Sequence, residues 1–339
     1  MVFLEVLLSL SLIQALRRFL GVLVSVVGLG TAGLDGEPIQ AGVKLQEAVA
    51  SVPASPAAPF RFEPGADQPA VLIPRSERLV YRAYLDIAFV TTSVGTVTQT
   101  SRVEQQRASV MMPATEGESA SVQLFAKGKY LGYSLKSTIE SRILPQDWPH
   151  ILYLATSEGS ERRRREVMIG RVDGEPTSSY RSDTSKNAPE GTRIWRDARV
   201  RKVPEGTLDM LSAVLMARTL VREEREKIVF PLIDKDHIWQ LALERGEQRR
   251  METGAGTFDV VEVILHPAPY PGEDIDQEKL DRFEGVFGIH GTIHLWVDRR
   301  TGVAVRIQGD LPVGPLTLGI DVVLDSYSGT PADFAPTKN

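Results

Sequence analysis

Two histidines are the first candidates for chemistry, because imidazole nitrogens bind metals and exchange protons near neutral pH. His290 and His294 are four residues apart. On an α-helix this spacing would place both imidazoles on one face, where they could share a metal ion. In a β-strand four residues span about 13 Å, at a rise of roughly 3.3 Å per residue, which is too far for one ion. Residues 292–297 alternate between apolar and polar types, which indicates a strand, and neither an HExxH motif nor a cysteine pair occurs, so we expect no metal site.

A run of four arginines, residues 162–165, lies between Glu161 and Glu166. In an extended strand Arg162 and Arg164 point to one face and their neighbours point to the other. Guanidinium groups bind phosphate and carboxylate in a bidentate manner, so Arg162 and Arg164 are candidate ligands for an anionic head group or glycan. The alternative is a solvent-exposed edge strand whose charge prevents aggregation and whose glutamates pair with the arginines.

Asp209 and Ser212 are three residues apart and would share one face of a helix. A serine hydrolase also needs a histidine base and an oxyanion hole, and neither a GxSxG nor an SxxK motif occurs in the sequence. We therefore interpret Asp209 as a residue of the first helical turn and Ser212 as a packing residue. Paired acids of the kind that hydrolyse glycosidic bonds remain open, because the 44 Asp and Glu residues allow many pairings in space.

Aromatic side chains could line an apolar pocket or fill the core. For most of the aromatic residues the core is the favoured interpretation, because a large β domain needs aromatic volume. Beside Arg162 and Arg164 we keep four aromatic residues as candidates for ligand binding. They are Tyr130, Tyr133, Trp239 and Trp296.

The glycines Gly28, Gly30 and Gly33 match the GxGxxG pattern of dinucleotide-binding folds. Such a fold needs these glycines to open a helix within a βαβ unit. They are followed instead by residues 34–38, LDGEP, a stretch typical of a turn. We therefore expect no nucleotide site and no cofactor.

The first 32 residues predict export. Arg17 and Arg18 precede an apolar run over residues 19–29, which ends in small residues. A basic segment, a short apolar run and a small-residue site are typical of a secretory signal peptide. The apolar stretch upstream, residues 3–16, could instead lengthen this segment into a retained anchor, or could reflect a misplaced start codon. We expect a periplasmic or otherwise exported protein that contacts the membrane only through this segment.

Composition excludes several classes of protein. A net charge of -5 argues against a nucleic-acid binder, which normally carries a basic excess. The chain has no cysteine, which excludes disulfides, thiolate metal sites, cysteine nucleophiles and a lipidated N-terminal cysteine.

The sequence divides into four parts. Residues 1–32 form the signal peptide or anchor, and residues 33–75 form a linker rich in proline and alanine. Residues 76–334 form a single β-rich domain, and residues 335–339 form a tail. Because proline fixes φ and lacks a backbone donor, we expect the linker to be extended.

Alternating apolar residues predict β-strands through most of residues 76–334. The pattern is clearest over residues 292–324, which predict an antiparallel meander with one buried face. Residues 207–222 predict an amphipathic helix, because apolar residues recur every three or four positions. We predict a mainly β fold: a large curved antiparallel sheet, or an open β-barrel, with one packed amphipathic helix.

Five blocks of sequence resemble a family of bacterial exported proteins. The blocks are SERLVY at residues 76–81 with Gly95 and Thr96, GKYLGY at 128–133, LDMLS at 208–212, FEGVFG at 283–288, and the closing meander at 296–312. The family is catalogued as domain of unknown function 3108, and the resemblance covers roughly residues 76–334. It implies an exported envelope protein without an assigned activity. It also implies a curved antiparallel sheet or open barrel, similar to the folds that carry lipoproteins across the periplasm.

Three functions remain open. The first is a non-enzymatic periplasmic protein that binds an amphipathic lipid or another component of the cell envelope, such as a polymer. The second is an envelope hydrolase or glycan-modifying enzyme that uses paired carboxylates. The third is an assembly partner whose proline-rich arm, residues 49–76, docks another protein. The oligomeric state stays open in all three.

Overall fold

The computed structural model describes most of the compact unit Pro53–Asn339. The expected signal or anchor, the glycines near residue 30, residues 33–57 of the linker and the tail lie outside the described residues. The described residues are 58–87, 90–106, 117–130, 133–159, 162–183, 194–273, 275, 283, 285, 289–313 and 316–329.

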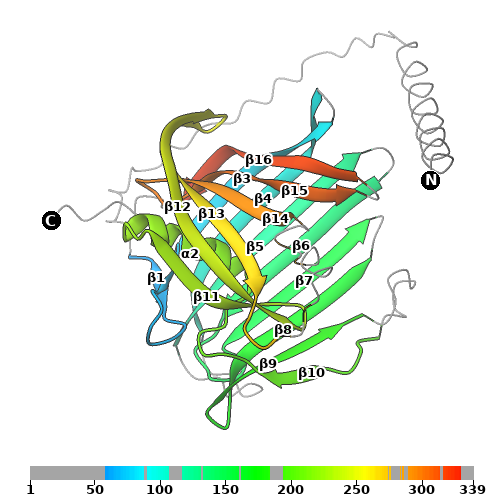
Figure 1. Ribbon diagram of the computed structural model, residues 1–339, viewed down its shortest axis with the longest axis vertical. Helices are drawn as coiled ribbons and strands as arrows, with labels where there is room; N and C mark the ends of the chain where they lie inside the picture. Colours follow the sequence, from blue (N-terminus) through cyan, green and yellow to red (C-terminus); the bar gives the residue numbers. More distant parts are fainter. Residues whose placement is uncertain are drawn as a thin grey trace, which may run out of the picture. The chain divides into compact units, whose positions relative to one another are not determined.

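One antiparallel sheet of 14 strands dominates the described residues, and it is not closed into a barrel (Figure 1). Its order is β10-β9-β8-β7-β6-β5-β4-β3-β16-β15-β14-β13-β12-β11. The predicted fold, mainly β with one packed helix, is confirmed in the form of an open curved sheet. The first eight strands in sequence are β3 (Ser76–Ile87), β4 (Val90–Gln106), β5 (Gly117–Tyr130), β6 (Tyr133–Ile143), β7 (Ile151–Gly159), β8 (Arg163–Val172), β9 (Glu175–Ser182) and β10 (Arg199–Lys202). The other six are β11 (Lys227–Asp234), β12 (His237–Thr253), β13 (Gly256–Pro269), β14 (His290–Asp298), β15 (Ala304–Val313) and β16 (Leu316–Gly329).

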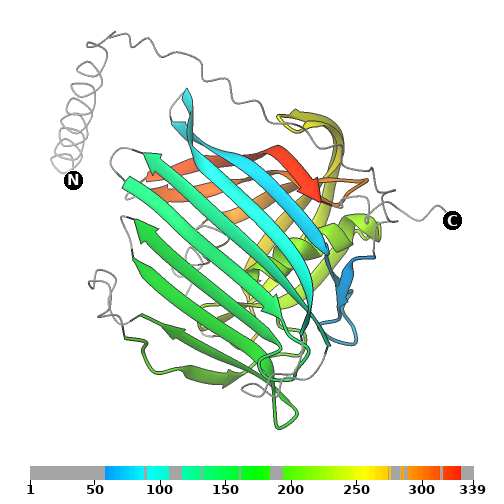
Figure 2. The ribbon, with the colours of Figure 1, turned by 180° about the vertical axis from the view of Figure 1, so that it is seen from behind.

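The sheet consists of two walls that meet where β16 pairs with β3 (Figure 2). The first wall contains β3 to β10, and the second contains β11 to β16. Within each wall every strand pairs with its neighbours in sequence, so local hairpins build both walls. The contact between β3 and β16 is the exception, because it joins strands from opposite ends of the described residues.

Each wall has one apolar face, which follows from the alternation of side chains along a strand. In β8, Val167 and Ile169 are buried, whereas Arg164 and Glu166 lie on the opposite, polar face. The apolar faces of the two walls point toward each other and enclose the core. The meander expected over residues 292–324 is confirmed as β14, β15 and β16.

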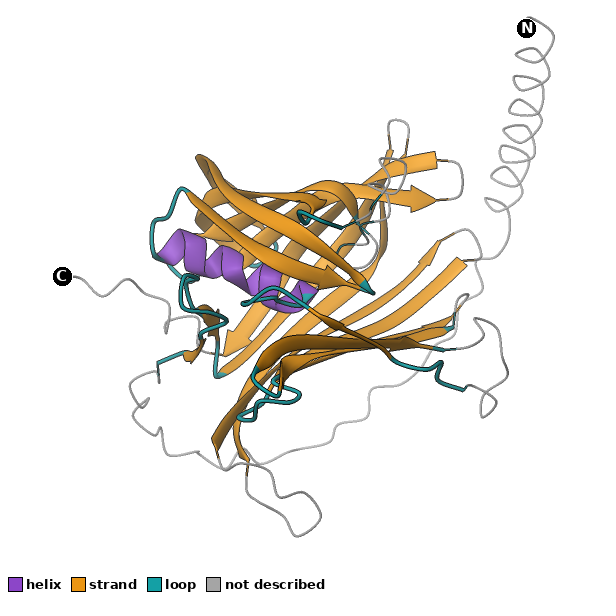
Figure 3. Ribbon diagram, turned by 60° about the horizontal axis from the view of Figure 1, so that its bottom comes forward, coloured by secondary structure: helices purple, strands orange, loops and turns teal. Residues whose placement is uncertain are grey.

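The helix α2 (Met210–Arg222) lies between the two walls (Figure 3). It begins within the predicted span, and Asp209 precedes it as the N-cap. The Asp209 side chain accepts hydrogen bonds from the backbone N–H groups of Leu211 and Ser212. The helix is buried on nearly all sides because it contacts β2, β6 and β11 to β14. This burial is more complete than the single apolar stripe in the sequence suggests, since small residues such as Ala213 and Ala217 also face packed neighbours.

Two short strands lie within the segment that was expected to be an extended linker. The strands β1 (Phe60–Phe62) and β2 (Val71–Ile73) form a separate antiparallel ribbon. All three residues of β2 are buried, and β2 packs against α2. The Val-Leu-Ile triplet therefore joins residues 58–75 to the folded unit, even though the surrounding prolines are typical of a linker.

Candidate ligand-binding pocket

A pocket of about 540 Å³ lies where the ribbon, the first wall and the end of α2 meet. Its apolar lining comes from four buried side chains, each from a different segment. Phe62 belongs to β1, Ile151 to β7 and Ile169 to β8, and Val203 follows β10. These side chains belong to the main core, so the pocket opens onto the apolar face of the first wall.

Charged residues surround this apolar lining. Arg171 and Glu205 form an ion pair at 2.5 Å between Nη2 and Oε1. Arg225 and Glu223 form another, at 2.7 Å between Nε and Oε2. Within the described residues, three further pocket residues make no ion pair: Arg61, Glu63 and Asp147. The pocket thus has a mainly polar lining that carries both signs of charge beside a smaller apolar surface.

Gly170 allows the loop between β6 and β7 to form one side of the pocket. The backbone oxygen of Asp147 accepts a hydrogen bond from the Arg171 N–H at 2.7 Å, and the His150 N–H donates to the Ile169 oxygen at 2.8 Å. A Cβ atom at position 170 would lie 2.1 Å from the Asp147 oxygen, closer than atoms can approach. Glycine is therefore required here for the two segments to touch.

Gln68 places an unpartnered acceptor in the pocket lining. Its Oε1 atom is buried, and it has no hydrogen-bond partner within the part of the chain that the structure describes. A buried polar atom without a partner carries a desolvation cost, which a donor group could remove.

The predicted arginine pair does not reach this pocket. Arg162 precedes β8 and is exposed, and the backbone N–H and Nε of Arg164 both bind Asp183, with Nε to Oδ1 at 3.0 Å. The guanidinium of Arg164 also stacks on Trp195 at 4.7 Å from the ring centroid. β8 is an interior strand between β7 and β9, so the alternative of an edge strand is wrong.

Trp239 and Trp296 are both buried, at 2% and 3% exposure. The ring of Trp239 packs on Phe283 with centroids 5.2 Å apart. The ring of Trp296 lies under Arg249, at 3.5 Å from the guanidinium carbon to the ring centroid. Neither tryptophan lines the described pocket. Tyr130 and Tyr133 pair with each other at the turn between β5 and β6, and their side chains lie outside what the structure describes.

His290 and His294 both belong to β14, as the alternation of apolar and polar residues predicts. The imidazole Nδ1 of His294 lies 2.7 Å from Glu262 Oε1 on the neighbouring strand β13. Within the described residues, no three His, Asp or Glu side chains gather in a way that could hold a metal ion.

Asp209 and Ser212 belong to a buried polar cluster beneath the start of α2. The hydroxyls of Ser141 and Ser212 donate to Asp209 Oδ2 at 2.7 and 2.8 Å. Burial raises the pKa of the Asp209 carboxyl, and the hydrogen bonds from Ser141, Ser212 and Leu211 oppose that rise. Every donor in this cluster is used inside the protein, so the cluster holds the helix on β6.

The sequence does not predict this pocket, because its residues come from distant segments and share no motif. One local signal was present: Glu63-Pro-Gly-Ala66 and Pro204-Glu-Gly206 are turn-like stretches, and both contribute to the pocket. Their approach depends on the packing of the ribbon against the sheet.

Two solved structures overlap with most of the chain at low similarity. One is a candidate lipoprotein from Parabacteroides distasonis, with 10% identity and a TM-score of 0.29, covering 75% of this chain and 95% of that one. The other is a candidate exported protein with a YmcC-like fold from Bacteroides fragilis, with 10% identity and a TM-score of 0.28, covering 80% of this chain and all of that one. TM-scores this low do not establish a common fold.

No curated protein matches the chain in sequence. Among the described residues, no helix is both long and apolar enough to cross a membrane. The family model described as a protein of unknown function (DUF3108) matches residues 80–321, which is most of the sheet. The chain therefore belongs to the DUF3108 family, as the resemblance of its sequence blocks indicated.

Proposed function

We propose that this protein is an exported, non-enzymatic protein of the cell envelope that holds an amphipathic ligand in the 540 Å³ pocket. The observation that carries the proposal is the lining itself, in which buried apolar side chains lie beside charged ones of both signs. An acyl or other apolar group would contact Phe62, Ile151 and Ile169. A head group would contact the charged residues.

Export is part of the proposal and rests on the N-terminal sequence. The basic pair Arg17 and Arg18, followed by an apolar run, is the pattern that directs a chain out of the cytoplasm. An envelope location is also where amphipathic molecules are abundant.

A pocket-filling variant tests ligand binding. Ala66 is exposed and lines the pocket, so Ala66→Trp would occupy the space without disturbing the core. With dodecylphosphocholine below its micellar concentration as the probe, we expect calorimetry to show binding that Ala66→Trp weakens by at least about tenfold, because the indole and the probe compete for one space. Ala268→Trp is the matched control, since Ala268 is exposed on β13 and does not line the pocket. Equal binding by both variants would contradict the proposal.

The natural ligand is sought separately. Organic extraction of the protein purified from its own cells, followed by mass spectrometry, is expected to recover an amphipathic molecule from the natural protein and less of it from Ala66→Trp. Recovery of the same amount from both would place the ligand elsewhere on the protein.

A second candidate function, hydrolysis of an envelope glycan, is favoured by one observation. Four carboxylates line the same pocket, and Glu63 and Asp147 make no ion pair within the described residues. Paired carboxylates are the usual catalysts of glycoside hydrolysis. If this candidate holds, Glu63→Gln and Asp147→Asn should each lower the release of sugar from peptidoglycan fragments by about 10²- to 10⁴-fold. A natural protein that releases no sugar would remove this candidate and leave the binding proposal intact.

A further inference from the structure

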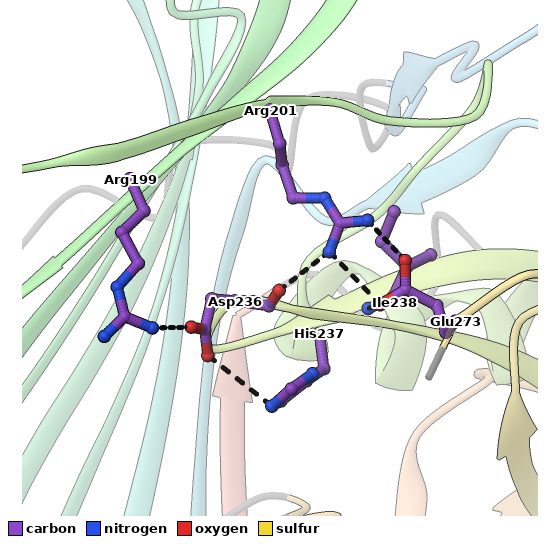
Figure 4. A network of polar contacts seen from close by, with 6 residues as sticks. All are labelled: Arg199, Arg201, Asp236, His237, Ile238 and Glu273. Carbon is purple, nitrogen blue, oxygen red and sulfur yellow. Dashed lines mark hydrogen bonds and ion pairs between the residues drawn. The ribbon is translucent and has the colours of Figure 1, made fainter. Parts of the chain in front are cut away.

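The edge strand β10 comes close to the turn that follows β11, the strand at the other edge of the open sheet. No ladder of backbone hydrogen bonds joins these two strands in the described residues, although every other pair of neighbouring strands has one. Side chains make the connection instead (Figure 4). We call the group of Arg199, Arg201, Asp236 and Glu273 the seam cluster.

Arg201 is the centre of the seam cluster. Its guanidinium binds both carboxylate oxygens of Glu273, with Nη1 at 3.1 Å from Oε2 and Nη2 bound to Oε1. The same Nη1 donates to the backbone oxygen of Asp236 at 3.0 Å. Arg199 adds an ion pair to the Asp236 carboxylate. Both arginines belong to β10, whereas Asp236 lies in the turn between β11 and β12 and Glu273 lies in the segment after β13.

The acidic partners are held in place by their own wall. Glu273 Oε2 accepts a hydrogen bond from the Ile238 N–H at 3.3 Å, and the Glu273 side chain is 10% exposed. Asp236 lies in the turn between β11 and β12, with His237 Nε2 at 3.7 Å from its Oδ1. Arg199 and Arg201 are more exposed, at 67% and 38%. The seam cluster therefore consists of more buried acids and more solvent-exposed bases.

A contact of this kind is weaker than the pairing between neighbouring strands of the sheet. Ion pairs between exposed groups contribute little and are screened by salt, whereas an antiparallel strand pair has two backbone hydrogen bonds at every second residue. Any opening of the sheet should therefore begin between β10 and β11.

The segment that follows β10 limits how far it can move. Leu208 binds the edge of β11 through two backbone hydrogen bonds, from its N–H to the Pro231 oxygen and from the Ile233 N–H to its own oxygen, each at 3.0 Å. Between β10 and Leu208 lies Gly206, whose φ of +73° is a conformation that glycine adopts readily. Residues 203–207 are the segment that would have to turn if β10 moved while Leu208 stayed bound.

Opening of the seam would change the pocket. Val203 and Pro204 follow β10 directly, and Pro176 lies in β9, to which Val203 is bound by an N–H to oxygen hydrogen bond of 3.1 Å. All three residues line the pocket. A displacement of β9 and β10 therefore carries part of the pocket lining with it.

We propose that the seam cluster opens reversibly and controls access to the pocket. This inference rests on the proposed function only for the identity of the ligand that enters. Release of Arg201 from Glu273 frees β10 to swing away from the second wall about residues 203–207. The pocket widens between its β9–β10 side and the ribbon, and re-formation of the ion pairs closes it.

The opening can be measured without any ligand, as a distance between two labels on the protein. Because the chain contains no cysteine, introduced cysteines are labelled selectively. Val200 and Val229 are 65% and 40% exposed, on opposite sides of the seam. Spin labels on Val200→Cys and Val229→Cys, measured by pulsed electron spin resonance, should report one narrow distance distribution. We expect Arg201→Ala to add a longer and broader population. About 1 M NaCl, where the Debye length is about 3 Å, should produce a smaller change in the same direction.

Two controls separate seam opening from a general loss of structure. Lys202→Ala removes a neighbouring positive charge whose partner, Glu175, lies on the same side of the seam, so it should leave the distribution unchanged. A second label pair, Lys127→Cys on β5 with Glu158→Cys on β7, lies inside the first wall and should not respond to Arg201→Ala. An unchanged distance between positions 200 and 229 in Arg201→Ala would overturn the proposal, as would an equal change in the control pair.

Control of access is measured with the same probe as before. In stopped-flow mixing with dodecylphosphocholine, we expect Arg201→Ala to raise the association rate constant several-fold and Lys202→Ala to leave it unchanged. A seam that opens in a protein whose probe binding is insensitive to Ala66→Trp would overturn the pocket function and keep the seam. A rate constant that Arg201→Ala does not change would overturn control of access, whatever the seam itself does.

Discussion

Two buried polar contacts fix the position of α2 between the walls. At the start of the helix, Asp209 accepts hydrogen bonds from Ser141 and Ser212. Toward its end, Arg218 binds Glu77 of β3 through two hydrogen bonds of 2.9 and 2.5 Å, and both side chains are buried. Because polar contacts are directional, they fix the rotation of the helix more tightly than apolar packing alone would.

The raised pKa of Asp209 leads to a prediction about pH. A carboxyl whose pKa is higher in the folded protein than in the unfolded chain stabilises the fold at low pH. That contribution is lost as the pH rises through the folded pKa. Asp209→Asn should keep the N-cap, since Asn and Asp cap helices about equally well, and it cannot ionise. We expect the free energy of unfolding of the variant, relative to the natural protein, to increase as the pH rises above about 4.

Urea unfolding of both proteins at a series of pH values measures this difference. Other carboxyls titrate in both proteins, among them Glu118 and Glu244, whose pKa values are lowered by hydrogen bonds from Arg75 and Lys227 respectively. Their contributions cancel when one curve is subtracted from the other. A difference that does not vary with pH would show that Asp209 titrates as it does in the unfolded chain.

The pair of Arg218 and Glu77 leads to a prediction about stability. Arg218→Ala leaves Glu77 buried without its main partner, which should lower the free energy of unfolding by about 3–5 kcal/mol. The double variant Glu77→Leu with Arg218→Met replaces both charges by apolar groups of similar volume and should recover most of that loss. Chemical denaturation of the three proteins tests both statements. A double variant as unstable as Arg218→Ala would mean that the ion pair itself stabilises the fold, beyond the cost of leaving one buried charge unpaired.

At the scale of elements, the ribbon of β1 and β2 should be an integral part of the fold. Ile73 is 1% exposed, and its strand β2 packs against α2. Ile73→Ala should therefore cost about 2–5 kcal/mol, the range found for large-to-small changes in a core. Val200→Ala, at a residue 65% exposed, is the control and should change stability by less than about 0.5 kcal/mol. Equal effects of the two changes would mean that the ribbon is dispensable.

The elements differ in how far local sequence determines them. β14 to β16 follow from alternation, because apolar residues at every second position are buried, as in Leu295 and Val297 of β14 and in Val322 and Leu324 of β16. The helix also follows from local spacing, and Asp209 indicates its start. The ribbon does not, because Val71-Leu-Ile73 is too short a run to be distinguished from an apolar patch in a linker. Its strand structure depends on burial against α2, which only the tertiary fold supplies.

The candidate site depends on contacts between distant residues, so no local pattern reveals it. The pocket joins residues as far apart as Arg61 and Arg225, and the seam cluster beside it pairs Arg201 with Glu273, 72 residues away. Charged residues of this kind are common in the chain, and their spacing in sequence says nothing about which of them meet. The arginine run shows the same dependence, because Arg164 binds Asp183, 19 residues away, and Glu166 binds Arg181.

At the scale of the whole molecule, β16 joins the two walls into one sheet. It pairs with β15 on one side and with β3 on the other, so the last described strand connects the two ends of the described chain. Buried residues of both walls and of the ribbon form a single core, which includes Leu324 of β16 and Tyr81 of β3. A single core built on contacts of long sequence separation favours cooperative folding in one unit, with folding slow relative to that of local hairpins.

Removal of β16 should therefore abolish folding of the whole unit and not only of its neighbour. A chain that ends at Val313 leaves β3 and β15 each with an unpaired edge and exposes the apolar side chains that β16 covers. We expect this chain to show no cooperative thermal transition by circular dichroism and to be digested throughout by a nonspecific protease. Removal of residues 335–339 alone is the control and should leave the transition intact. A chain ending at Val313 that still unfolded cooperatively, with protease-resistant fragments from one wall, would show that the walls fold independently. In that case the seam cluster and the pairing of β16 with β3 would be two contacts that join walls able to fold separately.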